Sequence, residues 1–306
     1  MTPDERPPAE HASADHSSTG VTRTRAFDAL GWPFAVASDD PDLVAYVSEL
    51  YAGLPDAPSD APVHRYRIVA DQFDGQLDGQ SAAHEVVLDG DRVGTNDDAS
   101  ALVTTIVHDV NRHAIDTSSW LLAHAGGVVG ATGAVVLPAH QEAGKTTLTT
   151  GLVRGGFGYL TDEAVAFDWD TLEITAYAKP LSLDPGSWPL FPQLEPQGPF
   201  DGDGYKDEQW QVTPGAIRAG AVVPSAHARF VVFPRYRPGA PTQLLPIRRA
   251  EGVVELAKNT FHFREHGRRA LDALARLVLS VDCYRLDVGE LDAAVAAITD
   301  LAGVPA

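Results

Sequence analysis

A short glycine-lysine-threonine stretch constrains this chain most, because it is the typical end of a phosphate-binding loop. Gly144, Lys145 and Thr146 occupy the last three positions of the pattern GxxxxGK[ST]. An apolar run, 134–137, leads into the loop, and a helical pattern, 145–154, leads out of it. In such a loop backbone N–H groups curl around phosphates, the lysine reaches the terminal phosphates and the hydroxyl binds Mg²⁺. The predicted nucleotide-binding segment is Ala139, His140, Gln141, Glu142, Ala143, Gly144, Lys145, Thr146 and Thr147.

The first half of this loop departs from the usual pattern. Ala139 stands where the first glycine belongs, and Glu142 stands among the residues that would wrap the phosphates. Glycine is favoured where φ must be positive, and a carboxylate that faced ATP would oppose its charge. We therefore expect Glu142 to face outward or to pair with a basic group, and the loop to curl less tightly than usual.

Two carboxylates follow the next predicted strand. A short apolar strand, 157–160, leads almost directly into Asp162 and Glu163. The carboxyl ends of neighbouring strands in an α/β sheet converge on one crevice, so we expect this pair to face the loop. Carboxylates there can hold Mg²⁺ or accept a proton from an attacking hydroxyl. An isolated aspartate is more often a helix or turn cap, but the spacing from the loop favours the functional interpretation.

Composition limits the partners and the compartment. The chain has 306 residues and a formal net charge of −19, which disfavours nucleic acid and membrane surfaces as partners. The single cysteine, Cys283, excludes an internal disulfide and fits a reducing, cytoplasmic compartment. Residues 1–24 lack the apolar core of a signal peptide and are expected to be a disordered tail. The charge-free stretch 117–141 is dense in glycine and alanine, and is interpreted as two strands and a turn rather than a membrane helix.

Hydrophobic periodicity and turn signals predict an α/β protein in two parts. Residues 25–116 are expected to form a small α+β module, with an Asp89-Gly90 hairpin, and residues 117–306 a P-loop kinase domain with a mixed sheet and C-terminal helices. The segment 186–205 is expected to be an ordered loop or a lid. The segment 26–37 is expected to be an opening strand and loop. The other expected strands are 64–70, 84–94 as a hairpin, 119–129, 132–137, 157–160, 164–168, 172–177, 228–234, 242–246 and 283–286, and the expected helices are 41–51, 98–115, 145–154, 250–258, 267–280 and 290–301.

These motifs together resemble the C-terminal catalytic domain of HPr kinase/phosphorylase, and in particular the actinobacterial HPr-kinase-like proteins. The resemblance rests on the GKTTL stretch 144–148, on the Arg154-Gly155 helix end and on the acidic pair within GYLTDEAVA. It covers 118–168 with specific motifs and continues more loosely to the C-terminus. The first hundred residues do not match the N-terminal domain of the authentic HPr kinases.

The resemblance implies roles for individual residues. Lys145 would contact phosphate, Thr146 would bind Mg²⁺, and Asp162 would accept or donate the proton in phosphoryl transfer. A catalytic histidine would lie near the acidic pair, and His124 has the matching spacing to the loop; a histidine that is simply part of the core is an equal alternative. The implied metal ligands are Thr146, Asp162 and Glu163.

The leading hypothesis is therefore a kinase that uses ATP and Mg²⁺ to phosphorylate a serine-type hydroxyl on a protein, peptide or small molecule. The alternative is a nucleotide-binding accessory protein without kinase activity that assists modification of a peptide or natural product. A third possibility is a vestigial loop. A carboxykinase-type enzyme ranks lower, because no arginine and histidine constellation suits a small dicarboxylate. Lys179 and the basic cluster 262–269 are within the range of a phosphate contact, but a solvated side chain is the more common fate of such residues.

Overall fold

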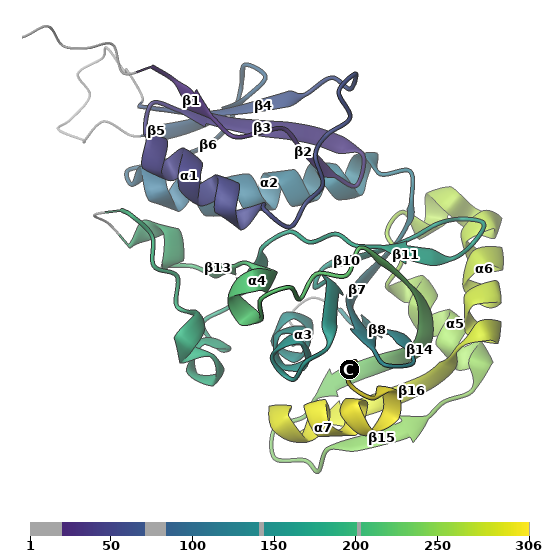
Figure 1. Cartoon of the computed structure of the whole chain (residues 1–306). Coiled ribbons are helices and arrows are strands. Elements are labelled where there is room, and N and C mark those ends of the chain that lie inside the picture. The colour runs from purple at the N-terminus through teal and green to yellow at the C-terminus, as the bar shows by residue number, and fades with distance from the viewer. Residues whose placement is uncertain (1–19, 71–83, 141–143, 201–202, 306) are drawn as a thin grey trace, which may run out of the picture.

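The chain forms a mixed α/β structure, as its sequence patterns predict. The computed structural model describes residues 20–70, 84–140, 144–200 and 203–305. Figure 1 shows one sheet with helices α1 and α2 on one face, next to a second, larger sheet that is flanked by α3, α5, α6 and α7. None of the helices in these ranges is long and apolar enough to cross a membrane.

The first sheet is built from the N-terminal third of the chain. Its strands lie in the order β1, β3, β4, β5, β6, and β2 pairs with β3. β3 and β4 run parallel, and the other pairs are antiparallel. The elements are β1 Thr22–Arg23, β2 Phe27–Ala29, β3 Trp32–Ser38, α1 Pro41–Leu50, β4 His64–Ala70, β5 His84–Leu88, β6 Asp91–Asn96 and α2 Leu102–Thr117, which follows a 3₁₀ turn at Ala99–Ala101.

Short-range signals determine where these elements begin and end. The Asp40 side chain accepts hydrogen bonds from the backbone N–H groups of Asp42 and Leu43, and so caps α1. Asp89 and Gly90 both have positive φ, 52° and 105°, as a two-residue hairpin turn requires. The hairpin predicted from this dipeptide is confirmed.

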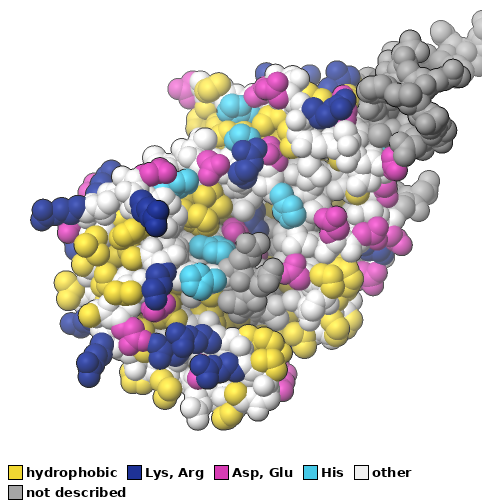
Figure 2. All heavy atoms as spheres, turned by 180° about the vertical axis from the view of Figure 1, so that it is seen from behind, with side chains coloured by type: hydrophobic (Ala, Val, Ile, Leu, Met, Phe, Trp, Pro, Cys, Tyr) yellow, Lys and Arg dark blue, Asp and Glu magenta, His cyan; other side chains and the backbone are white. Residues whose placement is uncertain are grey.

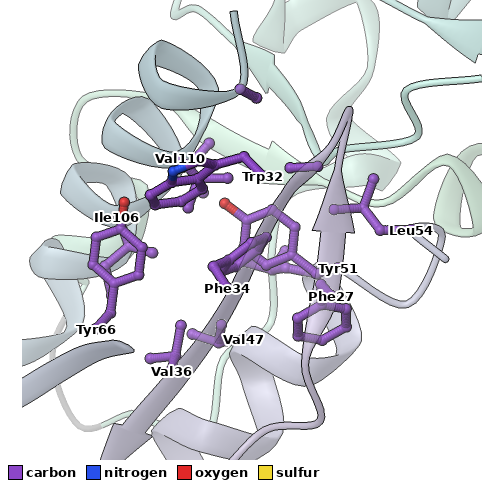
Figure 3. Packing of buried hydrophobic residues seen from close by; sticks show 14 of the residues in the cluster. Phe27, Trp32, Phe34, Val36, Val47, Tyr51, Leu54, Tyr66, Ile106 and Val110 are labelled. Carbon is purple, nitrogen blue, oxygen red and sulfur yellow. The ribbon is translucent and has the colours of Figure 1, made fainter. Parts of the chain in front are cut away.

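Aromatic side chains fill the space between the first sheet and its helices (Figure 3). The Phe34 ring centroid lies 5.5 Å from that of Phe27 and 4.9 Å from that of Tyr51. Rings of this size contribute most of the apolar area that folding removes from water. Helices α1 and α2 lie between the first sheet and the second part of the chain (Figure 1), which adds Leu122, Ala164, Ala166 and Tyr177 to this core.

The second sheet is mixed. Its strands lie in the order β11, β10, β7, β8, β14, β16, β15, and β9 pairs with β7. β11 also pairs with β14, so β7, β8, β14, β11 and β10 close into a ring. β14 runs parallel to both β8 and β16. The strands are β7 Leu121–Gly130, β8 Gly133–Pro138, β9 Gly158–Thr161, β10 Ala164–Phe167, β11 Glu173–Thr175, β14 Ser225–Tyr236, β15 Gln243–Pro246 and β16 Asp282–Val288.

The remaining elements surround this sheet. β12 and β13 form a separate antiparallel pair. Helix α6 contains a kink at Gly267, whose φ of 53° lies outside the helical range. The elements are α3 Lys145–Arg154, β12 Leu181–Leu183, β13 Trp210–Val212, α4 Pro214–Ile217, α5 Arg249–Lys258, α6 Phe263–Ser280 and α7 Leu291–Ala302.

Three expectations from the sequence are corrected. The disorder expected over 1–24 is wrong for Thr22–Arg23, which pair with Ser38 and Ala37 as strand β1; residues 1–19 lie outside the described residues. β8 and β9 are not neighbours, because β7 lies between them. Since β7 is antiparallel to both, their carboxyl ends still point to the same edge of the sheet. The strands expected at 228–234 and 242–246, with a Pro-Gly turn between them, are not neighbours, because β16 lies between β14 and β15.

Helix α3 is seated directly on β7. A Cβ atom added at Gly126 of β7 would lie 2.4 Å from Thr149 Oγ1 of α3. Thr149 is fully buried, and its Oγ1 has no hydrogen-bond partner among the described residues. The missing side chain at Gly126 therefore sets the distance between helix and sheet. It also sets the position of Lys145 and Thr146, which occupy the first turn of α3.

We predict that Gly126→Ala lowers the free energy of unfolding by about 1–3 kcal/mol, the usual range for an overpacked core. The clash involves one oxygen atom, so Gly126→Ala/Thr149→Ala should be more stable than Gly126→Ala alone. Urea unfolding of the two single variants and the double variant measures this coupling. Strictly additive losses would show that this contact does not seat the helix.

Candidate active site

The phosphate-loop pattern ends at the first turn of α3, as the sequence predicts. Gly144 has a left-handed backbone, φ 79° and ψ 20°, immediately before Lys145, the first helical residue. The space around a Cβ at Gly144 is open, so glycine is needed there for its φ and not for lack of room. Gly144 has no side chain to cap the helix, and the backbone N–H groups of the first turn favour an anion.

The first position of the loop does not require glycine. Among the described residues, Ala139 is not one of the non-glycine residues with positive φ, so the backbone conflict expected there is absent. Ala139 is buried, and its N–H donates to the His124 carbonyl at 3.4 Å. Ala139 therefore occupies the first position of the loop pattern without backbone strain. The expected loop residues Gln141, Glu142 and Ala143 lie outside the described residues.

Lys145 is buried at the start of the helix. Its Nζ donates a hydrogen bond to the His140 carbonyl at 3.0 Å. Loss of hydration lowers the pKa of Lys145, although the negative charges of Glu163 and Asp162 act in the opposite direction. The ammonium group is thus held near the acidic pair, in an environment where additional negative charge would stabilise it.

Asp162 is the most densely contacted of the predicted site residues. Its side chain is 1% exposed. One oxygen, Oδ1, lies 3.1 Å from Lys179 Nζ and accepts a hydrogen bond from the Tyr159 hydroxyl at 3.0 Å. The other, Oδ2, accepts a hydrogen bond from Thr146 Oγ1 at 3.1 Å. The carboxylate therefore joins the first turn of α3 to the end of β9 and to the segment that enters β12.

Glu163 faces a histidine instead. Its Oε1 lies 3.4 Å from His124 Nε2. Burial raises the pKa of Glu163, but the hydrogen bond from His124 and the charges of Lys179, His124 and Lys145 outweigh it and lower the pKa to about 2. His124 also packs on the Phe261 ring, at a centroid distance of 5.4 Å. The structure thus brings His124 next to the acidic pair, as the spacing predicted.

These groups open onto a cavity of about 740 Å³. One wall is formed by Lys145, Thr146 and the acidic pair, and another by Asn111 and Arg112 of α2. The N-terminal module therefore contributes side chains to the same cavity as the predicted phosphate loop.

The segment 186–205 contributes Ser187 to the lining of this cavity. Ser187 Oγ and Thr147 Oγ1 form a hydrogen bond of 2.6 Å, so the predicted loop residue Thr147 is used to anchor this segment to α3. The Trp188 ring stacks on Trp210 at 4.8 Å between centroids. Within its described residues the segment is an ordered loop, as expected, with 3₁₀ turns at Trp188–Leu190, Pro192–Leu194 and Gly204–Lys206.

A chain of hydrogen bonds connects the residues on both sides of this segment to the N-terminal module. His108 Nε2 of α2 lies 2.8 Å from Gln209 Oε1. Gln209 Nε2 donates to Asp184 Oδ1 at 2.7 Å. All three residues line the cavity, so its rim joins both parts of the chain.

The oxygen atoms at the site fit Mg²⁺ only together with a phosphate ligand. The described residues contain no group of three His, Cys, Asp or Glu side chains placed to hold a metal ion. Mg²⁺ in nucleotide sites, however, uses only one or two carboxylates and keeps waters and phosphate oxygens as its other ligands. Thr146, Asp162 and Glu163 supply a hydroxyl and two adjacent carboxylates of this kind.

Sequence reasoning missed two contributors to the site. Lys179 was expected to be solvated but is 3% exposed and paired with Asp162. A lysine between Ala178 and Pro180, inside an otherwise apolar stretch, was the available signal, since buried charges need a partner. The second contributor is the wall formed by Asn111 and Arg112 of α2, and no sequence pattern pointed to these residues. No residue of the basic cluster 262–269, all of which the structure describes, lines the cavity. This agrees with the expectation that these side chains are solvated and do not contact phosphate.

Comparison of the chain with models of known protein families finds no match, and comparison with curated proteins finds none either.

We predict that Lys179→Met lowers the free energy of unfolding by about 3–5 kcal/mol, because it leaves a buried carboxylate without its counter-charge. Asp162→Asn/Lys179→Met should lose less than the sum of the single variants, since neither charge then remains. Lys258→Met is the matched control, because it breaks an exposed pair with Glu255 and should cost less than about 1 kcal/mol. Urea unfolding provides the four values; a coupling near zero would contradict the role assigned to the pair.

The pKa of Glu163 predicts a defined pH dependence. Its value of about 2 in the folded protein lies below the value of about 4.3 in an unfolded chain, so the ionised form stabilises the fold above that higher pH. This contribution is lost as the pH falls toward about 2. The stability difference between the wild type and Glu163→Gln, from urea unfolding, should be larger at about pH 5 than at about pH 3. His124→Gln should reduce that stability difference. A stability difference that grows as the pH falls would refute the assignment.

Proposed function

We propose that this chain is a phosphotransferase of the HPr-kinase-like P-loop type, which transfers the γ-phosphoryl group of ATP to a hydroxyl acceptor. The observation that carries the proposal is the 3.1 Å contact between Thr146 Oγ1 and Asp162 Oδ2. This contact joins the end of the phosphate-loop pattern to the carboxylate that follows strand β9. Lys145 and Glu163 line the same cavity, so phosphate-binding and proton-accepting groups share one reaction space.

Each residue then has a role that its surroundings support. Lys145 and the backbone N–H groups of the first turn of α3 bind the phosphates. Asp162 accepts the proton of the acceptor hydroxyl while the acceptor oxygen bonds to the γ-phosphorus. The bond from that phosphorus to the bridging oxygen breaks, and ADP leaves. Lys179 and Tyr159 hold Asp162 in position.

Mg²⁺ would be held by Thr146, Asp162 and Glu163 together with the nucleotide. Its chemistry there would be neutralisation of phosphate charge. Glu163 is suited to this position because its lowered pKa keeps it ionised at neutral pH. His124 orients Glu163 through the 3.4 Å contact.

One observation favours the second candidate function, a nucleotide-binding accessory protein without kinase activity. Asp162 is 1% exposed, and both of its oxygens already have partners. A general base must come within hydrogen-bond reach of the proton that it accepts. In this candidate Asp162 would serve only to hold α3, and the cavity would bind the nucleotide without turnover.

The two candidates differ in a transfer assay with γ-labelled ATP, Mg²⁺ and a panel of serine and threonine peptides and small hydroxyl compounds. We predict labelled product with the wild type and a loss of at least about 100-fold with Asp162→Asn, the usual contribution of a positioned base. ATP should still raise the melting temperature of Asp162→Asn, once circular dichroism shows that the variant is folded.

Lys145→Met is the binding control. It should remove the rise in melting temperature caused by Mg-ATP but should not destabilise the protein itself, because burial already disfavours the charged lysine. Stabilisation of the wild type by ATP without transfer to any acceptor would favour the accessory protein. Absence of stabilisation by ATP would reject both and leave the loop vestigial.

A further inference from the structure

A second, smaller cavity lies at the end of β8. Its volume is about 180 Å³, below the roughly 300–1,000 Å³ typical of pockets for drug-sized ligands, so it suits a single ring system. Pro138 to His140, at the end of β8, form one side. Phe233, Pro234 and Ile247 give it an apolar wall. Its polar groups come from Arg235 and Arg285 of the sheet and from Glu255 and Asn259 at the end of α5.

Asn259 presents an unused hydrogen-bond acceptor. The residue is 6% exposed, and its Oδ1 has no hydrogen-bond partner among the described residues. Its Nδ2 donates to the Glu255 carbonyl at 2.9 Å, which fixes the orientation of the amide. A buried acceptor without a donor is unfavourable, so this oxygen favours a ligand that brings an N–H or O–H group.

Arg235 is the complementary donor. The neighbouring arginines Arg229, Arg237 and Arg285 each pair with a carboxylate, whereas the side chain of Arg235 is exposed and forms no ion pair or hydrogen bond with a described residue. Figure 2 shows Lys and Arg side chains gathered on the lower part of the face seen from behind, despite the negative charge of the whole chain. A planar guanidinium can stack on an aromatic ring and donate to its nitrogen atoms.

The second cavity adjoins the phosphate site at two points. His140 lines the second cavity, and its carbonyl oxygen accepts the hydrogen bond from Lys145 Nζ at 3.0 Å. Asn259 also lines it, and its carbonyl oxygen accepts a hydrogen bond from the His124 N–H at 2.6 Å. Lys145 and His124 both line the larger cavity. The two cavities therefore adjoin at the carbonyl groups of His140 and Asn259.

We propose that the second cavity is the base subsite of the nucleotide and that it selects adenine. The exocyclic amine of adenine donates to Asn259 Oδ1, and Arg235 stacks on the ring or donates to a ring nitrogen. A lone anion would face the acceptor Oδ1, and a lone cation would face Arg235, so a neutral ring with both donors and acceptors fits best. Guanine and hypoxanthine carry an oxygen in place of the amine and would bring two acceptors together. This inference rests on the proposed nucleotide site.

The test compares Mg²⁺ complexes of ATP, ITP and inorganic triphosphate by thermal shift and calorimetry on the full chain. ITP differs from ATP only at the 6 position and N1 of the base, where a carbonyl and an N–H replace the amine and the ring acceptor, and triphosphate reports the phosphate site without a base. We expect ATP to bind about 10-fold more tightly than ITP, the size of one lost hydrogen bond to a buried group. Asn259→Leu should remove this preference and leave triphosphate binding unchanged.

Arg235→Ala provides a second variant that should not affect folding, because the side chain is exposed. It should weaken ATP but not triphosphate, while Arg248→Ala, which removes an exposed arginine outside the cavity, should weaken neither. Equal affinity for ATP and ITP in the wild type, or an Arg235→Ala variant with unchanged ATP affinity, would overturn the base subsite. If triphosphate still binds in that case, the proposed function survives; if nothing binds, both fail.

Discussion

The buried pair between Asp162 and Lys179 is the interaction on which the site depends. Removing two charges from water costs several kcal/mol per ion. Their mutual attraction offsets this cost only when the geometry is good and the remaining lone pairs and protons form hydrogen bonds. Here Tyr159 and Thr146 satisfy them. The carboxylate can be buried only if β9, the segment before β12 and the first turn of α3 all meet at one point. The pair therefore links the correct packing of three separate segments to the formation of the cavity.

The close contact of α3 with β7 also helps to form the site. Gly126 lets the helix approach until Thr149 meets the strand, and at that height the Thr146 hydroxyl reaches Asp162. A helix held further out would leave that carboxylate oxygen without its donor. The phosphate-loop end and the acidic pair are thus not two independent motifs. Both depend on one packing arrangement, in which Gly126 sets the position of α3 and the buried Asp162 accepts the hydrogen bond from its first turn.

Local sequence patterns predicted the elements well, because the forces that define them are local. The Asp89-Gly90 turn has the conformation that its residues favour, and helix α3 spans the predicted range of 145–154. The order of strands was harder, since insertion of β7 between β8 and β9 depends on pairings between distant segments. Lys179 illustrates the same limit. Its apolar neighbours signalled burial, but its partner belongs to another strand, and no periodicity connects the two.

The charge balance of the cavity determines which ionic ligands it favours. Lys145 and Lys179 face Asp162 and Glu163, so the group is locally neutral within a chain of net charge −19. Lys145 has a lowered pKa because it is desolvated, and a phosphate beside it would restore the stability of its charged form. Asp162 is already compensated by Lys179, so a free cation would compete with that ammonium for the carboxylate. The arrangement thus favours an anion that arrives together with its own cation, which is the charge pattern of a magnesium nucleotide.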